Sequence, residues 1–452
     1  MRRDLLTEKE KNKIRRQPRF HGIHPLEYRL FLQRTQTSKQ EAEYVRKAIE
    51  KGECGSHGEN IEAIEEMVSA RIGCKNATAL SSGTAAMHLA VKLAAERVYG
   101  RTAVGGALRE RQVFCSDFTS IDSVNPVLYE GGEPIFIDMS PCDWGMDPEA
   151  LEIAFSIYPD VKIVIMSHPY GVPGQIPEIR EICDRHGALL IEEATDCLGA
   201  GILCHPQGGG NTDAKVNKGQ PTNATTIYPV GSFGDYSILD FGEDRMISGG
   251  AGGMFLTNDD VSGHKARKNS MSNLVAGLIR GQLPYVEEYV AQKKAVYDYY
   301  AERFSEDIIY MNPIGEGSVP SYQTSCMTSE SAIPFSEIRT DQSYHYESHH
   351  GTAAPMEIIE ALEAFNIEAG TVYKPMHEQP LLAGCDLITP DGSMKQAMER
   401  SSADWYSESS QTFKTGICLP SSMVMTREEQ EMVVEIVYAC FDGAEIDRMM
   451  WA

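Results

Sequence analysis

The chain has 452 residues, 42% of them hydrophobic and 23% charged, which is enough for a large core and for two domains. Its formal net charge is −24. An excess of negative charge of this size repels nucleic acid and anionic membrane surfaces, so we expect neither as a partner.

The 11 cysteines are scattered and form no C-x-x-C pair. The sequence therefore predicts no metal site and no disulfide framework, and it favours a reducing, cytoplasmic location. The charged start MRRDLLTEKEKNKIRRQ lacks the apolar stretch of a signal peptide, and no apolar run is long enough to span a membrane.

From residue 37 onward the chain alternates helical and strand patterns. Residues 37–73 predict two amphipathic helices separated by the glycine-containing turn GECGSHGEN. Short apolar strands and helices then follow one another. We expect strands at 76–80, 111–117, 133–139, 161–168 and 188–194, and helices at 81–100, 147–155 and 176–187. This alternation is typical of an α/β domain with a mostly parallel sheet between helices.

The remaining segments complete the predicted domain organisation. Residues 1–40 form an N-terminal extension, and 41–284 form the large α/β domain. Residues 201–230 are rich in Gly, Asn, Thr and Pro and predict a long loop within it. Residues 285–452 contain a long helix followed by a small C-terminal α+β domain.

The strongest functional signal is an ordered set of short motifs. They are SSGTAAMHLA (81–90), FTSIDSVNPVLYEGGEPIFIDM (118–139), SHPYG (167–171), LLIEEATDCLGA (189–200), GSFGD (231–235), GGAGGMFLTND (249–259), YKPMHEQP (373–380) and CLPSSMVMT (418–426). In order and spacing this set resembles the DegT/StrS family of pyridoxal-phosphate (PLP) nucleotide-sugar aminotransferases. The resemblance implies the PLP-transferase fold type I and a dimer with active sites at the subunit interface. It also implies PLP as cofactor and a nucleotide-sugar-like substrate from polysaccharide or amino-sugar biosynthesis.

PLP catalysis needs a lysine for the Schiff base, a carboxylate against the pyridine nitrogen and hydrogen-bond donors around the phosphate. The resemblance places the phosphate at the turn formed by Ser82, Gly83 and Thr84, at a helix N-terminus. The second phosphate ligand, a serine in the family, is Asp240 here. A carboxylate about 4 Å from a phosphate costs about 4 kcal/mol per unit charge at an effective dielectric constant near 20.

The resemblance also assigns the catalytic positions, and most of them have changed. The lysine position is Arg245, whose guanidinium stays protonated and does not form an imine. Glu193 replaces the aspartate that faces the pyridine nitrogen, and Asp196 takes the place of the neighbouring Gln or Glu. Ser120 stands where a stacking aromatic ring belongs, two residues after Phe118, which we expect in the core.

A shortened segment and a histidine complete the resemblance. The stretch 264–283 is shorter than in the family, with Lys268 and Ser270 at the places of an Asn and an Arg that reach the partner's phosphate site. His168, in SHPYG, matches a histidine of the family and is a catalytic candidate. A lone histidine near a strand end is nevertheless more often structural.

Three functions remain open. Five altered cofactor contacts favour a homologue that has lost Schiff-base catalysis and acts as a ligand-binding or partner subunit, in a homodimer or with a catalytic paralogue. Covalent binding of PLP is then not expected, and Arg245 and Asp240 should form an ion pair that fills the vacated site. The alternatives are an active PLP aminotransferase or dehydratase of unusual design, and a non-catalytic interaction protein that uses the 201–230 loop.

Overall fold

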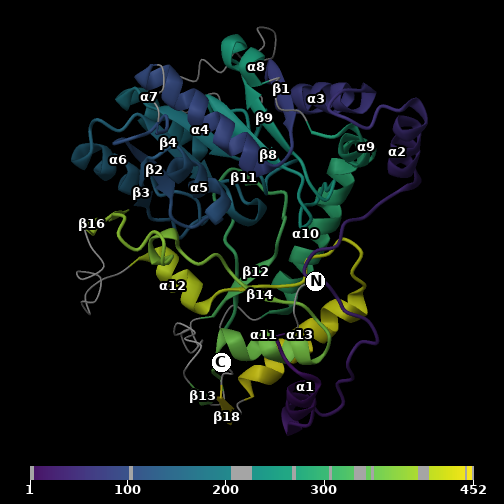
Figure 1. Cartoon of the computed structure of the whole chain (residues 1–452). Coiled ribbons are helices and arrows are strands. Elements are labelled where there is room, and N and C mark those ends of the chain that lie inside the picture. Colours follow the sequence, from purple (N-terminus) through teal and green to yellow (C-terminus); the bar gives the residue numbers. More distant parts are fainter. Residues whose placement is uncertain are drawn as a thin grey trace.

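A nine-stranded mixed sheet forms the centre of the larger part of the molecule (Figure 1). The computed structural model describes residues 5–100, 105–204, 226–266, 271–304, 308–329, 343–347, 351–394, 407–442 and 445–449. The strand order is β1-β9-β8-β5-β4-β2-β3-β15-β16. These strands are β1 Asn76–Leu80, β2 Gln112–Ser116, β3 Glu133–Ile137, β4 Ile163–Ser167, β5 Leu189–Glu193, β8 Tyr236–Asp240, β9 Gly253–Thr257, β15 Leu387–Thr389 and β16 Gly392–Met394.

The pairing is parallel from β8 to β15 and antiparallel at the two ends of the sheet. The predicted mostly parallel sheet is thus confirmed. Its last two strands, β15 and β16, come from the C-terminal part of the chain, where the sequence predicts the small domain. They extend the sheet beyond β3.

Helices cover both faces of this sheet, because alternate residues of each buried strand point to opposite sides. In β4, Ile163 and Ile165 belong to the core under α4 and α5, whereas Val164 and Met166 belong to the core under α6 and α7. Toward β9 the latter face is covered by α3 and α9 instead. The helices around the sheet are α2 Lys39–Lys51, α3 Glu59–Ile72, α4 Gly83–Tyr99, α5 Ile121–Tyr129, α6 Pro148–Ile157, α7 Ile176–His186, α8 Asp260–Ala266 and α9 Asn273–Gln282.

The segment 201–230 corrects one prediction. Its two ends are strands, β6 Gly201–Cys204 and β7 Thr226–Pro229, which pair with each other in antiparallel register. A third strand, β11 Ser318–Val319, adds to β6. Ile202 and Ile227 supply the β-branched side chains that favour strands, a signal masked by the turn-rich composition between them. Residues 205–225, the middle of the expected loop, lie outside the described residues.

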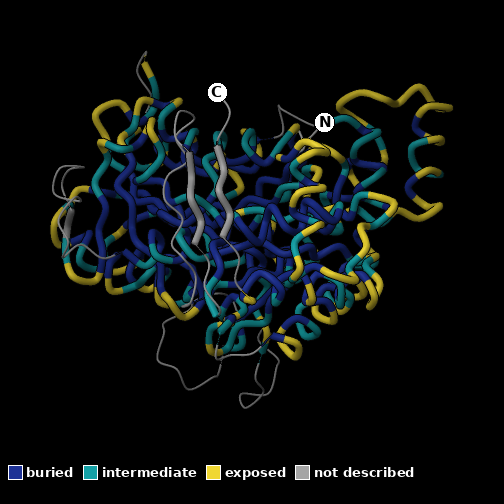
Figure 2. Tube along the Cα trace, turned by 90° about the horizontal axis from the view of Figure 1, so that it is seen from below, coloured by how far each residue is buried: buried dark blue, intermediate teal, exposed yellow. Residues whose placement is uncertain are grey.

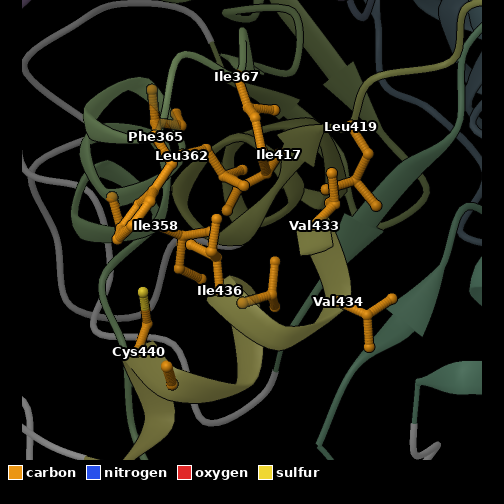
Figure 3. Packing of buried hydrophobic residues seen from close by; sticks show 14 of the residues in the cluster. Ile358, Leu362, Phe365, Ile367, Ile417, Leu419, Val433, Val434, Ile436 and Cys440 are labelled. Carbon is orange, nitrogen blue, oxygen red and sulfur yellow. The ribbon is translucent and has the colours of Figure 1, made fainter. Parts of the chain in front are cut away.

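The small C-terminal part is an antiparallel sheet with helices packed on it. Its strand order is β10-β12-β17-β14. Apolar residues one turn apart face each other from α11 and α13, among them Ile358 and Leu362 on α11 and Val433 and Ile436 on α13, and Phe365, directly after α11, adds to them (Figure 3). The elements of this part are α10 Val286–Arg303, α11 Pro355–Ala364, α12 Glu408–Thr415, α13 Arg427–Phe441, β10 Tyr310–Met311, β12 Cys326–Thr328, β14 Gly370–Thr371, β17 Ile417–Cys418, β13 Ser343–Glu347 and β18 Glu445–Met449.

The N-terminal segment packs on this small part rather than on the large sheet. Helix α1 Glu8–Arg15 lies beside α11 (Figure 1). Leu6, Ile14, Phe20 and Leu30 are buried in the same apolar core as α11 and α13. The extension is therefore part of the small core, at least from residue 5 onward.

Buried residues run continuously through the large sheet and the small part, and exposed ones lie at the periphery (Figure 2). Among the helices of the described ranges, none combines the length and apolar character that crossing a membrane requires.

Candidate functional site

The candidate site lies where parallel strands β5 and β8 end next to the beginning of helix α4. Glu193 is the last residue of β5, and Asp196 follows it; Asp240 is the last residue of β8. Because parallel strands end at the same edge of a sheet, these carboxylates lie along that edge. Gly83, the first residue of α4, faces Asp240 across this edge.

Arg245 is bonded to two of these carboxylates. Its Nε lies 2.9 Å from Oδ2 of Asp240, and its Nη1 donates to Oδ1 of Asp196. The side chain of Arg245 is 22% exposed, that of Asp240 19% and that of Asp196 6%. Burial opposes the charge of the guanidinium, but the carboxylates of Asp196 and Asp240 outweigh it and raise the pKa of Arg245 above its ordinary value. The ion pair expected between Arg245 and Asp240 is present, with Asp196 as a second partner.

The N-terminus of α4 already holds a carboxylate. The N–H of Gly83 donates to Oδ1 of Asp240 at 3.1 Å, and the hydroxyl of Ser82 caps the helix by accepting from the N–H of Ala85 at 3.0 Å. A Cβ atom on Gly83 would come within 2.8 Å of the Asp240 side chain. Since a helix N-terminus favours an anion, Asp240 occupies the position that the resemblance assigns to a phosphate.

Glu193 and Asp196 have different surroundings. Oε1 of Glu193 accepts from the N–H of Thr195 at 3.1 Å and from the Thr195 hydroxyl. Oδ2 of Asp196 accepts from the N–H of Tyr170 at 3.1 Å and from the hydroxyl of Tyr373 at 3.4 Å. Asp196 therefore joins Arg245 to an aromatic group, whereas Glu193 is held by its own turn.

Four aromatic rings form a cluster next to Asp196 of this network. Tyr170 and Tyr373 are stacked with ring centroids 4.8 Å apart, and Phe118 and Trp144 contact Tyr170 edge-on. Tyr170 and Trp144 have φ angles of 59° and 61°, a conformation that bulky residues rarely adopt. Burial, followed by the charge of Asp196, raises the pKa of Tyr373 well above its ordinary value. As predicted, Phe118 is a core residue, 1% exposed.

Tyr170 and Tyr373 were not predicted as site residues. Both lie within motifs of the resemblance, SHPYG and YKPMHEQP. The motifs were the available signal, but their pattern does not show which side chains meet.

The other predicted residues are more peripheral. Ser120 caps α5, with its hydroxyl accepting from the N–H of Asp122 at 3.4 Å. Thr84 is the second residue of α4 and partly buried. Lys268 and Ser270 lie outside the described residues.

His168 is buried, 1% exposed, behind the sheet edge. Its Nδ1 accepts from the N–H of Gly174 at 3.1 Å, so the ring proton belongs on Nε2, which lies 3.4 Å from Oε1 of Glu192. Glu192 also accepts from the backbone N–H groups of Gly231, Phe233 and Gly234. Burial alone would raise the pKa of Glu192, but His168 and the N–H groups of Gly231 and Gly234 lower it. These contacts favour a structural interpretation of His168.

Within the described ranges, no group of three or more His, Cys, Asp or Glu side chains is arranged to hold a metal ion. The site's chemistry thus depends on one guanidinium, several carboxylates and aromatic rings.

Comparison with known proteins shows which family the chain is similar to. The sequence model of the DegT/DnrJ/EryC1/StrS aminotransferase family matches residues 35–270 and 261–438. EpsN of Bacillus subtilis (strain 168), named as a candidate pyridoxal phosphate-dependent aminotransferase, is 28% identical over 447 residues, covering 93% of this chain and 98% of EpsN. GDP-perosamine synthase of Vibrio cholerae is 24% identical over 361 residues, covering 75% of this chain and 84% of the synthase.

A solved structure shows the same fold. The crystal structure of a DegT DnrJ EryC1 StrS aminotransferase from Brucella abortus superposes with a TM-score of 0.66 at 17% identity, covering 88% of this chain and 94% of that one. The predicted fold type I is confirmed, as is the resemblance on which it was based.

Proposed function

The chain belongs to the DegT/DnrJ/EryC1/StrS aminotransferase family, and we propose that it is a member without Schiff-base catalysis that serves as a ligand-binding or partner subunit. Relatives in this family include sugar aminotransferases such as GDP-perosamine synthase. By analogy, its ligand is a nucleotide-sugar-like molecule of polysaccharide or amino-sugar biosynthesis. Its partner is a second copy of the chain or a catalytic paralogue.

One observation carries this proposal: Arg245 is bonded to Asp196 and Asp240, while Asp240 accepts the N–H of Gly83 at the start of α4. The residue types do not fit PLP. A guanidinium supplies no nucleophilic amine, and a carboxylate beside the position assigned to the phosphate repels a dianion. The three side chains pair with one another, so none of their charges is left without a partner in the absence of the cofactor.

The test is the absorption spectrum of the purified full chain mixed with PLP, before and after borohydride, with mapping of any modified lysine by mass spectrometry. We expect no imine band and no saturable adduct at a single lysine. The variant Arg245→Lys/Asp240→Ser restores both family residues and should give an imine band and an adduct at position 245. The matched control Arg245→Met/Asp240→Ser opens the same space without an amine and should not, which separates this position from surface lysines.

The second candidate function is an active PLP-dependent aminotransferase or dehydratase. It is favoured by the buried carboxylate of Glu193 at the end of β5 and by the turn Ser82, Gly83 and Thr84. A borohydride-stable adduct at one lysine of the wild-type chain would overturn our proposal and support this alternative.

A further inference from the structure

Lys293, in the middle of α10, is a fully buried lysine that takes no part in the ion pairs of Arg245, and it is 1% exposed. Its Nζ donates to the backbone oxygens of Gln323 and Ser421, each at 2.8 Å, and to the side-chain oxygen of Gln33. All three acceptors are neutral, and they come from segments far apart in the chain. Burial lowers the pKa of Lys293 to about 7, and the negative charge of Asp196 acts in the opposite direction.

Gln33 ends a segment that we call the N-terminal strap, residues 26–33. Within it, Leu30 forms a parallel bridge with Ile367, and its N–H donates to the backbone oxygen of Asn366 at 2.9 Å. The N–H of Leu32 donates to Oε2 of Glu368 at 2.8 Å. The strap thus lies along the small part of the molecule like an added strand.

The strap ends on the segment 321–324. Nε2 of Gln33 donates to the backbone oxygen of Gln323 at 2.6 Å and to the Thr324 hydroxyl at 3.2 Å. Lys293 and Gln33 therefore hold the same backbone oxygen, and both hold each other. This junction fixes one side of 321–324.

The other side of 321–324 faces the ion-pair site. Nε2 of Gln323 donates to the backbone oxygen of Asp244 at 2.6 Å, and Oε1 of Gln323 accepts from the N–H of Met246 at 3.0 Å. The side chain of Gln323 is thus hydrogen-bonded to the backbone on both sides of Arg245.

The same segment also fixes the partner of Arg245. The hydroxyl of Ser321 donates to the backbone oxygen of Asp196 at 2.7 Å. Segment 321–324 is packed closely against Gly171. A Cβ atom on Gly171 would lie 2.5 Å from both the backbone nitrogen of Gln323 and the hydroxyl of Ser321. Closely packed segments transmit displacement rather than absorb it.

We propose that the N-terminal strap supports Arg245 through 321–324: docking of Gln33 on Lys293 and Gln323 keeps the guanidinium in its ion pairs, and undocking loosens it. A ligand or partner that lifts the strap would thereby open the site. This inference rests on the proposed function in one respect, namely that the ion pairs of Arg245 close the site.

Hydrogen exchange measured by mass spectrometry on the full chain tests the coupling. The variant Gln33→Met keeps the size of the side chain and removes its polar contacts. We expect about tenfold faster exchange in peptides covering 27–33 and in peptides covering 241–250, since each hydrogen bond lost changes an opening equilibrium by roughly two- to tenfold. The matched control is Tyr28→Phe, which removes the bond from this strap residue to Glu429 on α13 and should leave 241–250 unchanged.

A second variant tests the middle of the path. Gln323→Met removes the side-chain hydrogen bonds to Asp244 and Met246 but keeps the backbone oxygen that accepts from Gln33. Hydrogen exchange should therefore become faster in 241–250 and stay unchanged in 27–33. Faster exchange confined to 27–33 in Gln33→Met, or an equal rise at 241–250 in Tyr28→Phe, would overturn the inference. Capture of PLP by the wild-type chain would overturn the proposed function instead and leave this coupling result unaffected.

Discussion

Replacement of Arg245 by methionine tests whether the ion pairs hold the site together. The change leaves the carboxylates of Asp196 and Asp240 without their cation, at side-chain exposures of 6% and 19%. Removing one partner of a buried pair typically costs about 3–5 kcal/mol, and the partial exposure of Arg245 places the expected loss near the lower end, at about 3 kcal/mol. That loss corresponds to a more than hundredfold smaller folding constant, since about 1.4 kcal/mol is tenfold.

Urea unfolding of the wild type and variants measures this loss. At a slope of about 3 kcal/mol per molar urea, Arg245→Met should lower the midpoint by about 1 M. The double variant Arg245→Met/Asp240→Ser should recover part of the loss, because one unpaired charge is then absent. The control Arg303→Met removes a pair with Glu431 whose side chains are 46% and 36% exposed, and it should change the midpoint far less. Equal midpoints for Arg245→Met and Arg303→Met would refute the reasoning.

Three more predictions concern buried groups. The pKa of Lys293 is lowered from 10.5 to about 7, so between these pH values the unfolded chain binds more protons than the folded chain. The stability of the wild type relative to Lys293→Met should therefore rise with pH in this range, by up to about 1.4 kcal/mol per pH unit. Urea titrations at several pH values measure this rise. Burial and the neighbouring charge of Asp117 raise the pKa of Asp138 from 3.8 to about 6. The wild type should therefore lose stability relative to Asp138→Asn as the pH rises from 4 to 6. A stability difference between the two proteins that does not change with pH would contradict this. Gly83→Ala should destabilise the chain by about 1–3 kcal/mol, because the Cβ atom of the new alanine would collide with the Asp240 side chain. Thermal unfolding should show that most of this loss disappears when the same change is made in an Asp240→Ser variant.

Strands β1 to β5 could be predicted because they are short apolar runs between helices, a strictly local pattern, whereas β8 was not predicted as a strand. The addition of β15 to β3 could not, because Leu387 and Phe136 are brought together only by the tertiary fold. The strands at 201–204 and 226–229 were hidden for a different reason. Their few apolar residues flank a turn-rich stretch, and composition over the whole window outweighed them.

Part of the site could be predicted from the sequence. Family spacing places positions 240 and 245 beside the same cofactor, so opposite charges at both positions predicted their pair. The participation of Asp196 and Tyr373 depends on side-chain conformations that no spacing encodes. Nor does any pattern in the sequence connect Gln33 with Lys293, since that contact requires the strap and α10 to be placed first.

The β15–β16 hairpin has a consequence for how the chain is made on the ribosome. Strand β3 pairs with β2 on one side. Its other side pairs with β15, which is synthesised much later. Until then the backbone groups along that side of β3 form an open edge, the kind of surface on which sheets of different molecules join. Cutting the gene before β15 would make the same edge permanent, so a fragment ending there should aggregate even though it contains every strand from β1 to β9.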